Sequence, residues 1–307
     1  MEKEQVVIVG YGWVGQANAL ALTQMGYQVA YIDPAEPPHH YKAHERLYTK
    51  IVRVDSIASV DSPDTVFVVC IGDKVSADGV QDISLIASAL SDLTHIKGTV
   101  ILRSTILPGK LKDLHFDYYF PEYLHEKVAV EECINPYIFV IGMRERPRPI
   151  SFLKEFELRA VKAFFGTPEE AAFLKYLWNI WNAIRIAFVN EFGNTIALPS
   201  NKDNLASIER IIDFMFERGI YRRYGRAFDG HCLPKDMRAF VRWYQDQGCD
   251  MSMLAGVNAS NATHKEIEKK YPILPEWYSQ YPERHISAKI ALKALWHTLL
   301  KYITLSY

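Results

Sequence analysis

Cys232 lies in a short polar segment, Phe228-Asp229-Gly230-His231-Cys232-Leu233-Pro234-Lys235-Asp236. Proline is favoured at the first position of a helix, so Pro234 predicts a helix that runs to about Gln247. Cys232 would then precede a helix N-terminus, where unpaired N–H groups and the helix dipole favour negative charge. A thiol so placed ionises more readily than a free one, which favours a nucleophile. The alternative is a buried structural cysteine, and the polar neighbours argue against it.

A second pattern that could carry chemistry is Gly10-Tyr11-Gly12-Trp13-Val14-Gly15. It follows an apolar run at 5–9, typical of a buried parallel strand, and opens a helix that runs to about Met25. The first two glycines let the backbone turn and approach a pyrophosphate, and the third permits close packing. We therefore expect Gly10, Gly12, Trp13, Val14 and Gly15 to bind a dinucleotide. The alternative is a glycine-rich turn that binds nothing.

Asp33 ends the next predicted strand, at residues 28–32, eighteen residues after Gly15. An acid at this place accepts hydrogen bonds from an adenosine ribose and repels a 2′-phosphate. It therefore indicates NAD rather than NADP. A turn aspartate before Pro34 is the plainer interpretation, and it is compatible with that role.

The N-terminal half alternates predicted strands with helices. Further strands are expected at 65–71, 100–103 and 137–141, with a helix near 82–93. This alternation predicts an α/β fold of the Rossmann type, with a doubly wound, mostly parallel sheet. Two loops at presumed carboxyl ends of strands, Ser104–Gly109 and Pro121–Glu126, would then face the cofactor crevice. Their polar residues include Ser104, Thr105, Glu122 and Glu126.

The second half of the chain is expected to be an all-helical domain, beginning with one long connecting helix over residues 168–198. Further helices are predicted at 204–218 and 251–269. On the long helix, four polar residues share a narrow stripe: Lys175, Asn179, Asn182 and Asn190. The stripe could be a solvated face, or it could be a site with a fixed cation.

Length and composition limit the possibilities. A chain of 307 residues suggests two domains, and a net charge of −1 does not point to nucleic acid or an anionic membrane. The four cysteines (Cys70, Cys133, Cys232 and Cys249) show neither metal-ligand spacing nor a disulfide framework, which fits the cytoplasm. We expect no metal, no signal peptide and no membrane span. The basic tail from His285 is predicted to be a helix that packs on its own protein or on a partner subunit, the alternative being a membrane surface.

Taken in order, these segments resemble the UDP-glucose/GDP-mannose dehydrogenase family of nucleotide-sugar dehydrogenases. The resemblance covers roughly residues 4 to 265. It rests on the glycine pattern with Asp33, the Ser104–Gly109 and Pro121–Glu126 loops, Lys175 with Asn179 and a downstream Asn190-Glu191, and the segment Gly230–Asp236. It implies a Rossmann domain at 1–148, a helical catalytic and dimerisation domain at 149–265 and a tail at 266–307. It also implies NAD as cofactor, a sugar nucleotide as substrate and a homodimer through the long helix.

The resemblance assigns roles to single residues. The family oxidises a primary alcohol on the sugar to a carboxylate in two NAD-dependent steps. Cys232 matches the nucleophile that captures the aldehyde as a thiohemiacetal, which is then oxidised to a thioester. Lys175 matches the lysine that stabilises the oxyanion. Asn179 and Asp236 match residues that hold an active-site water and support proton transfer. Glu122 matches a general base for thioester hydrolysis, and Thr105 matches an active-site hydroxyl. Glu126 and Lys235 match positions near the nicotinamide and the pyrophosphate.

Two departures from the family concern the substrate. The family has a third, C-terminal domain that holds the nucleotide, whereas only about forty residues here follow the helical domain. The loop ahead of the cysteine is usually rich in glycine, but here it carries arginines. We expect Arg222, Arg223 and Arg226 to line an anion pocket, the alternative being a solvated loop. Two other functions stay open: a single-step dehydrogenase of the hydroxyacid type, and a non-catalytic relative that binds NAD or dimerises.

Overall fold

The computed structural model describes residues 3–145, 147–216, 219 and 221–276 and divides the chain into two compact units. The sheet unit takes residues 3–74 and 83–175 of the described chain. The helical unit takes residues 75–82 and the described residues from 176 onward. The tail helix expected from His285 lies outside the described residues. The domain boundaries at 148 and 265 stay predictions.

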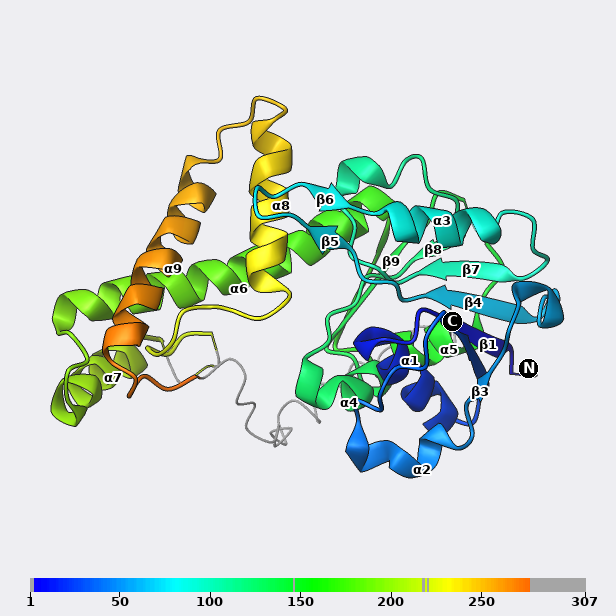
Figure 1. Ribbon diagram of the computed structural model, residues 1–307, viewed down its shortest axis with the longest axis horizontal. Helices are drawn as coiled ribbons and strands as arrows, with labels where there is room; N and C mark the ends of the chain where they lie inside the picture. The colour runs from blue at the N-terminus through cyan, green and yellow to red at the C-terminus, as the bar shows by residue number, and fades with distance from the viewer. Residues whose placement is uncertain (1–2, 146, 217–218, 220, 277–307) are drawn as a thin grey trace, which may run out of the picture. The chain divides into compact units, whose positions relative to one another are not determined.

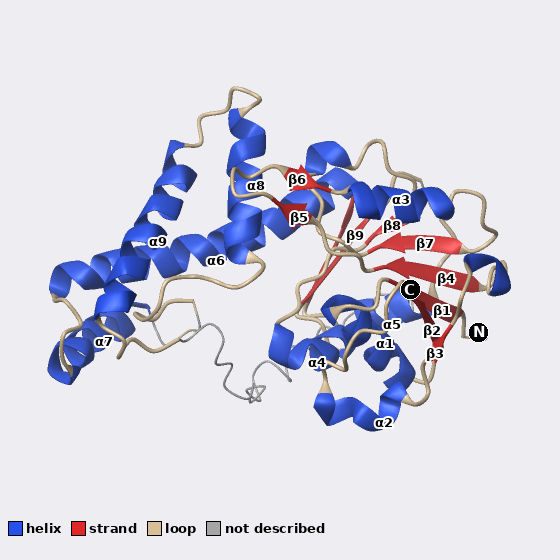
Figure 2. Cartoon of the chain, in the orientation of Figure 1, coloured by secondary structure: helices blue, strands red, loops and turns tan. Residues whose placement is uncertain are grey.

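One mixed sheet forms the sheet unit, with strand order β10-β9-β8-β7-β4-β1-β2-β3 (Figure 2). The strands are β1 (Gln5–Val9), β2 (Gln28–Ile32), β3 (Val52–Arg53), β4 (Thr65–Val69), β7 (Thr99–Leu102), β8 (Tyr118–Tyr119), β9 (Ile138–Gly142) and β10 (Lys162–Gly166). Neighbouring strands run parallel except for β8 and β9, which are antiparallel. The prediction of a doubly wound, mostly parallel sheet is confirmed.

Both faces of the sheet are covered, which explains why its central strands are apolar throughout. Val6 and Ile8 of β1 pack in one cluster with α1 (Trp13–Gln24), α4 (Ala129–Ile134) and α5 (Ser151–Arg159). Val7 and Val9 point to the other face, where α3 (Ser84–Asp92) packs (Figure 1). A buried parallel strand needs apolar residues on both sides, and the sequence of β1 supplies them. The short helix α2 (Glu45–Tyr48) precedes β3.

The order of the strands reverses at one point of the sheet. From β1 the chain continues to β2 and β3 on one side, and then returns to β4 and β7 on the other. Ligands of such folds bind outside the carboxyl ends of the strands where the order reverses. Here that point lies between β1 and β4, so the loops beginning at Gly10, Cys70 and Arg103 surround it.

Four helices make up most of the helical unit: α6 (Pro168–Ile196), α7 (Lys202–Phe216), α8 (Leu233–Gln245) and α9 (Ser252–Lys270). The first two turns of α6 belong to the sheet unit, which ends at Lys175. The ranges agree with the predicted helices to within about two residues at each end, as is usual for helix boundaries.

The helical unit also contains a small hairpin that the sequence did not predict. It is formed by β5 (Lys74–Val75) and β6 (Gln81–Asp82). Gln81 is buried and donates a hydrogen bond to the hydroxyl of Tyr176, with 3.3 Å between the atoms. A Cβ at Gly79 would lie 2.7 Å from the carbonyl oxygen of Arg238 in α8. The hairpin is therefore packed tightly on α8.

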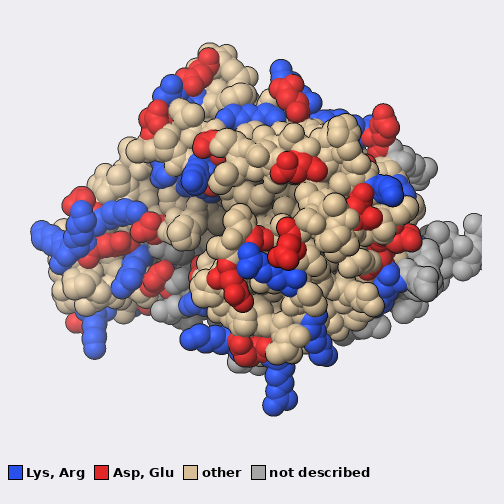
Figure 3. Space-filling model, turned by 45° about the vertical axis from the view of Figure 1, so that its right-hand side comes forward, with Lys and Arg blue, Asp and Glu red and all other residues tan. Residues whose placement is uncertain are grey.

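On the face drawn in Figure 3, positively and negatively charged side chains are interspersed. This agrees with the net charge of −1. Among the described residues, no helix combines the length and apolar character needed to cross a membrane.

Candidate functional site

The glycine pattern after β1 has the geometry that a phosphate-binding loop requires. Gly10 has φ of +90°, which favours glycine, and a Cβ at Gly15 would lie only 2.1 Å from the carbonyl oxygen of Gly10. Gly10 and Gly15 are thus fixed by the turn and by close packing. A Cβ at Gly12, in contrast, would have no atom within 4 Å. The open side of Gly12 leaves room for a ligand to approach the backbone.

Helix α1 begins directly after Gly12, and its N-terminus is not neutralised by a side chain. No side chain caps it, and no acidic residue stands in its first turn. Its first N–H groups are therefore available to an anion. Trp13 is 41% exposed and stacks on His40 with ring centroids 4.0 Å apart, whereas Val14 is half-buried. These features fit the pyrophosphate of a dinucleotide.

Asp33, at the end of β2, is bound to the glycine loop. Its carboxylate accepts hydrogen bonds from the backbone N–H of Tyr11 at 2.7 Å and of Ala35 at 2.9 Å. Asp33 is thus the expected turn aspartate, and it remains half-exposed, so further lone pairs can meet a ribose. The sequence pattern did not indicate Gln16. Its side chain is buried and donates hydrogen bonds to the carbonyls of Tyr11 and Pro38, at 3.0 Å each.

The loop after β7 carries three polar residues at the carboxyl end of this strand. Ser104 and Thr105 are buried, and the Ser104 hydroxyl lies 3.5 Å from the carbonyl oxygen of Val69 at the end of β4. Arg103 was missed by the sequence reasoning, although it is 3% exposed. Its guanidinium donates to the carbonyls of Phe120 and Pro121 at 3.0 and 3.1 Å. Arg103 therefore fixes the backbone immediately before Glu122.

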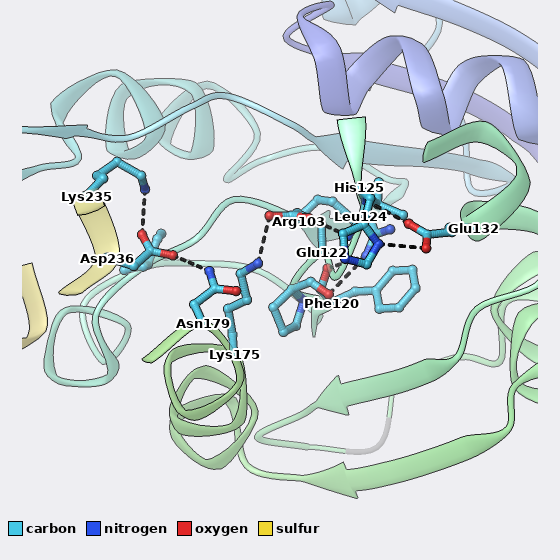
Figure 4. Close-up of polar contacts among 12 residues, drawn as sticks. Arg103, Phe120, Glu122, Leu124, His125, Glu132, Lys175, Asn179, Lys235 and Asp236 are labelled. Carbon is cyan, nitrogen blue, oxygen red and sulfur yellow. Dashed lines mark hydrogen bonds and ion pairs between the residues drawn. The ribbon is translucent and has the colours of Figure 1, made fainter. Parts of the chain in front are cut away.

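Glu122 and Lys175 form a buried ion pair with 2.9 Å between Nζ and Oε1 (Figure 4). Burial by itself would raise the pKa of Glu122. The positive charge of Lys175, the hydrogen bond from the Leu124 N–H and the charge of Arg103 outweigh it and lower the pKa. Glu122 is therefore an ionised carboxylate beside a fixed ammonium. Of the residues expected from the sequence, these two are brought into direct contact.

Glu126 is exposed and begins a one-turn helix over Glu126–Val128. Its charge acts on His40, whose pKa is lowered by burial and raised to a smaller extent by Glu126. His40 in turn stacks on Trp13 of the glycine loop. The structure therefore associates Glu126 with the expected cofactor residues.

In the helical unit a second polar cluster surrounds Asp236, which is 1% exposed. Asn179 of α6 donates to Oδ2 of Asp236 at 2.6 Å, and Nζ of Lys235 lies 2.8 Å from Oδ1 (Figure 4). Oδ2 thus accepts a hydrogen bond, whereas Oδ1 is paired with the positive charge of Lys235. Asn179 follows Lys175 by one helical turn on α6, so both project from the same face of that helix.

Cys232 stands at the N-terminal boundary of α8, where no side chain makes a capping hydrogen bond. Gly230, with φ of +79°, turns the chain into this position. The thiol of Cys232 is exposed and forms no disulfide. In contrast, Cys70 and Cys133 are buried, and burial raises the pKa of their thiols to about 12 and about 11. The alternative of a buried structural cysteine at position 232 is wrong.

The polar stripe of α6 is buried at all four positions, so it is not a solvated face. Lys175 belongs to the cluster with Glu122, and Asn179 belongs to the cluster around Asp236. Asn182 accepts a hydrogen bond from Arg185, one turn along the helix. Asn190 instead accepts from a backbone N–H and donates to a backbone carbonyl of the loop after α7. Only the first part of the stripe therefore adjoins residues that could do chemistry.

The three loop arginines differ in their surroundings. The guanidinium of Arg226 is 3.5 Å from Glu276 and donates to the Leu274 carbonyl at 3.1 Å. Arg222 and Arg223 are half-buried. The pKa of Arg185 is lowered by burial first, and the nearby charge of Arg222 contributes to the lowering. The structure thus brings Arg222 close to Arg185. The sequence analysis did not indicate Arg185 as a candidate for binding an anion.

Within the described residues, no group of three or more His, Cys, Asp and Glu side chains could hold a metal ion. The residues that could hold a cofactor are those of the glycine loop, Asp33, Ser104 and Glu126. Those that could act on a substrate are Glu122 with Lys175 in the sheet unit, and Cys232, Asn179 and Asp236 in the helical unit.

Comparison with known proteins gives consistent results. Residues 169–263 match the profile of the UDP-glucose/GDP-mannose dehydrogenase family, central domain. The chain is 26% identical to a GDP-mannose 6-dehydrogenase of Azotobacter vinelandii over 95% of this chain and 73% of that protein. It is 24% identical to a UDP-glucose 6-dehydrogenase of Pseudomonas aeruginosa over 86% of this chain and 66% of that protein.

Among solved structures, a UDP-glucose dehydrogenase from the hyperthermophilic archaeon Pyrobaculum islandicum superposes with a TM-score of 0.69 and 21% sequence identity. The superposition covers 88% of this chain and 69% of that chain. At this identity the likeness concerns the fold. The resemblance inferred from the sequence motifs is confirmed.

Proposed function

Because residues 169–263 carry the central domain of the UDP-glucose/GDP-mannose dehydrogenase family, we propose that this chain oxidises the primary alcohol of a nucleotide-linked sugar to a carboxylate in two NAD-dependent steps. The observation that carries the proposal is the exposed thiol of Cys232 at the N-terminus of α8. A single hydride transfer from an alcohol needs no nucleophile. An aldehyde, in contrast, has no hydride to give until a nucleophile or water adds to it.

The glycine loop and Asp33 are the proposed holders of NAD. Three observations support this: the open side of Gly12, the uncapped N-terminus of α1 and the half-exposed carboxylate of Asp33. NAD, when bound, accepts the hydride of each oxidation. The negative charge of Asp33 favours a ribose hydroxyl and disfavours a 2′-phosphate.

Cys232 is the proposed nucleophile of the second oxidation. Its sulfur adds to the aldehyde carbon, and the carbonyl oxygen takes the negative charge or a proton as the thiohemiacetal forms. Loss of the carbon-bound hydride then gives a thioester, and water cleaves it to the carboxylate and restores the thiol. Lys175 is the proposed stabiliser of the oxyanion, and Glu122 the proposed base that takes a proton from the hydrolytic water. Thr105 is a proposed active-site hydroxyl.

Glu122 is ionised at neutral pH, as a base must be, although its lowered pKa makes it a weaker base than a free glutamate. The buried pair of Asn179 and Asp236 supports a role in holding a water and guiding its proton. Lys235, at 2.8 Å from Asp236, forms an ion pair with that carboxylate. Glu126 and Lys235 are also proposed to lie near the cofactor.

Arg222 and Arg223 are the proposed ligands of the substrate's diphosphate, and Arg226 borders them. Arg185 strengthens this proposal. Its Nε is buried with no hydrogen-bond partner among the described residues, and the charge of Arg222 is close by. Two guanidiniums near each other are favourable when an anion lies between them, because each can donate a bidentate pair of hydrogen bonds.

A homodimer through α6 is also proposed. Large apolar side chains are exposed along one face of this helix at Leu177, Trp181, Phe188 and Phe192, with Phe214 on α7 91% exposed. Spacings of four and seven residues place such side chains on one stripe, and stripes of this kind mark protein interfaces. We propose the cytoplasm as the compartment, because reducing conditions suit exposed thiols at Cys232 and Cys249.

The decisive experiment incubates the protein with NAD and a panel of UDP- and GDP-linked sugars and simple hydroxyacids, and counts NADH formed per substrate consumed. Two equivalents of NADH with a sugar nucleotide support the proposal. One equivalent with a hydroxyacid would replace it with a single-step dehydrogenase. If NAD binds but no NADH forms with any member of the panel, the chain is a non-catalytic relative.

A further inference from the structure

The segment Gly225–Phe228, which leads into Cys232, is held by side chains rather than by regular secondary structure. Asn190 of α6 holds its first half. The Asn190 amide accepts a hydrogen bond from the N–H of Gly225 at 3.0 Å and donates to the carbonyl of Arg226 at 2.9 Å. Asn190 is fully buried, so both bonds lie away from solvent.

Helix α9 holds the second half of the same segment. Asn261 accepts a hydrogen bond from the N–H of Phe228 at 2.8 Å and donates to the Phe228 carbonyl at 2.9 Å. The carboxylate of Glu268 accepts from the N–H of Ala227. Almost every polar backbone group of the segment is therefore bound by another part of the helical unit. The carbonyl of Gly225 is bound by His264.

His264 of α9 is 2% exposed and is part of a directional chain of hydrogen bonds. Nε2 lies 2.6 Å from the Gly225 carbonyl oxygen, which can only accept. Nδ1 lies 3.0 Å from Nδ2 of Asn194, which can only donate. In this orientation the Oδ1 atom of Asn194 accepts from the hydroxyl of Tyr224 at 2.7 Å. His264 must therefore carry its proton on Nε2 and leave Nδ1 bare, which is the neutral form.

The surroundings of His264 offer little to stabilise a positive charge. Tyr224 packs against its ring edge-on, with centroids 5.7 Å apart, and Asn194 comes from α6. The charged groups nearest to the clamped segment are Glu268, Lys265, Asp229 and Arg226, and within the described chain none of them forms an ion pair with His264. Burial lowers the pKa of His264, and the bond to Gly225 raises it to a smaller extent.

We propose that neutral His264 is a positioning residue for the reactive thiol, because it holds Gly225 and through it the segment that leads into Cys232. Protonation of Nδ1 places an N–H against the amide N–H of Asn194. That amide can turn around only if the Tyr224 hydroxyl changes from donor to acceptor, so the clamp is weakened. This inference rests on the proposed role of Cys232, and it goes beyond that role in naming what holds the thiol in place.

The direction of the pH effect follows from the lowered pKa. An unfolded histidine has a pKa near 6.5, and His264 in the folded chain has a lower one. Below about pH 6.5 the unfolded chain therefore binds more protons than the folded one, so stability falls with decreasing pH. At neutral pH both forms are unprotonated and the clamp is intact. Opening is thus expected on the acidic side only.

Amide hydrogen exchange tests the clamp without requiring enzymatic activity. Protection of the Gly225, Ala227 and Phe228 amides, corrected for the intrinsic exchange rate, is measured from pH 7.5 down to pH 5. We expect protection in the unmodified protein to fall by about tenfold or more over this range. In His264→Gln, whose amide can donate to Gly225 but does not titrate, protection is expected to stay constant. A flat profile in the unmodified protein, or an equal fall in both proteins, overturns the proposal.

Alkylation by iodoacetamide at pH 7.5 tests the link to the thiol. Exposed Cys249, at the other end of α8, is the internal reference. His264→Phe is expected to slow alkylation of Cys232 relative to Cys249 by about threefold or more, because the helix terminus loses its support. His264→Gln is expected to restore the ratio. An unchanged ratio in a folded His264→Phe protein overturns the positioning role.

Both readouts separate this inference from the proposed function. Should His264→Phe fail to fold, the pH series on the unmodified protein still decides the matter. If no substrate gives NADH but the exchange and alkylation results hold, the enzymatic proposal fails and the clamp remains. If two equivalents of NADH form but exchange is independent of pH, the enzymatic proposal stands and His264 is only a packing residue.

Discussion

Two helix N-termini, one in each unit, begin in similar ways and present different groups to solvent. Helix α1 follows a glycine at φ +90° and α8 follows one at φ +79°, and neither helix has a side chain that caps it. At α1 the residue before the helix is Gly12, so the backbone itself is presented. At α8 that residue is Cys232, so a thiol lies at the uncapped helix N-terminus.

The packing around the two termini differs as well. A Cβ at Gly10 would lie 2.8 Å from the side chain of Ile71, whereas a Cβ at Gly230 would have no atom within 4 Å. Helix α8 also carries Asp236 in its first turn, while α1 has no acid there. The turn before α1 is thus closely packed and its helix begins without an acidic residue, whereas the turn before α8 is open and its helix begins with one.

The largest expected effect comes from removing the side chain that distinguishes α8. Cys232→Ser is predicted to reduce turnover at least about 1,000-fold, because a hydroxyl has a much higher pKa than a thiol and adds poorly to the aldehyde. Affinity for NAD, measured by titration calorimetry, should not change. Cys249→Ser is the matched control and should keep normal turnover. Normal turnover in Cys232→Ser would show that α8 does not present the nucleophile.

Next in size is the removal of the charge beside the α1 terminus. Asp33→Ala is predicted to narrow the preference for NAD over NADP by about 30-fold, since a hydrogen bond to a charged group contributes about 2 kcal/mol. Asp33→Asn keeps an acceptor for the Tyr11 N–H and isolates the effect of charge. Binding of both cofactors is measured by calorimetry. Equal affinities for NAD and NADP in the unmodified protein would contradict this prediction.

A matched pair of glycine variants separates packing from binding at α1. Gly15→Ala forces a backbone shift and is predicted to cost about 1–3 kcal/mol, seen as a melting temperature lower by about 5 °C. Gly12→Ala has space for its methyl group and should melt normally, but should bind NAD about tenfold more weakly because the methyl occupies the ligand's approach. A Gly12→Ala protein with normal affinity for NAD would place the ligand elsewhere.

The smallest expected effect asks whether anion binding also occurs in the helical unit. Arg222→Glu is predicted to raise KM for a sugar nucleotide about fivefold, with affinity for NAD unchanged, because the diphosphate loses one guanidinium and meets a carboxylate. Arg210→Glu, an equal charge change at an exposed site on α7, is the control. If both variants raise KM equally, the effect is one of net charge and the arginine loop is an ordinary solvated surface.

The sequence predicted the elements that are defined by local pattern. The apolar run at 5–9, the glycines after it and the proline at 234 each specify a strand, a turn or a helix start within a few residues. The short strands β3, β8 and β10 were missed because they have two to five residues, and β10 is largely exposed, so it lacks the pattern of a buried strand.

Residues that act through distant contacts could not be found in this way. Arg103 precedes two expected residues, Ser104 and Thr105, but its partners lie seventeen and eighteen residues later. His264 contacts Gly225 and Asn194, which are 39 and 70 residues away. A histidine on a helix with a mixed surface carries no local signal of such contacts. Only the fold brings these groups together.

The hairpin at residues 75–82 has a consequence for how this protein can be recombined. It folds with the helical unit, although the chain on both sides of it belongs to the sheet unit. A gene fusion that exchanged the helical unit as one continuous piece, from Tyr176 onward, would leave the original hairpin against a foreign α8. Gly79 admits no extra atom beside Arg238, and Gln81 needs the hydroxyl of Tyr176. A continuous segment that keeps these contacts must therefore begin at the hairpin, and it is longer than the helical unit itself.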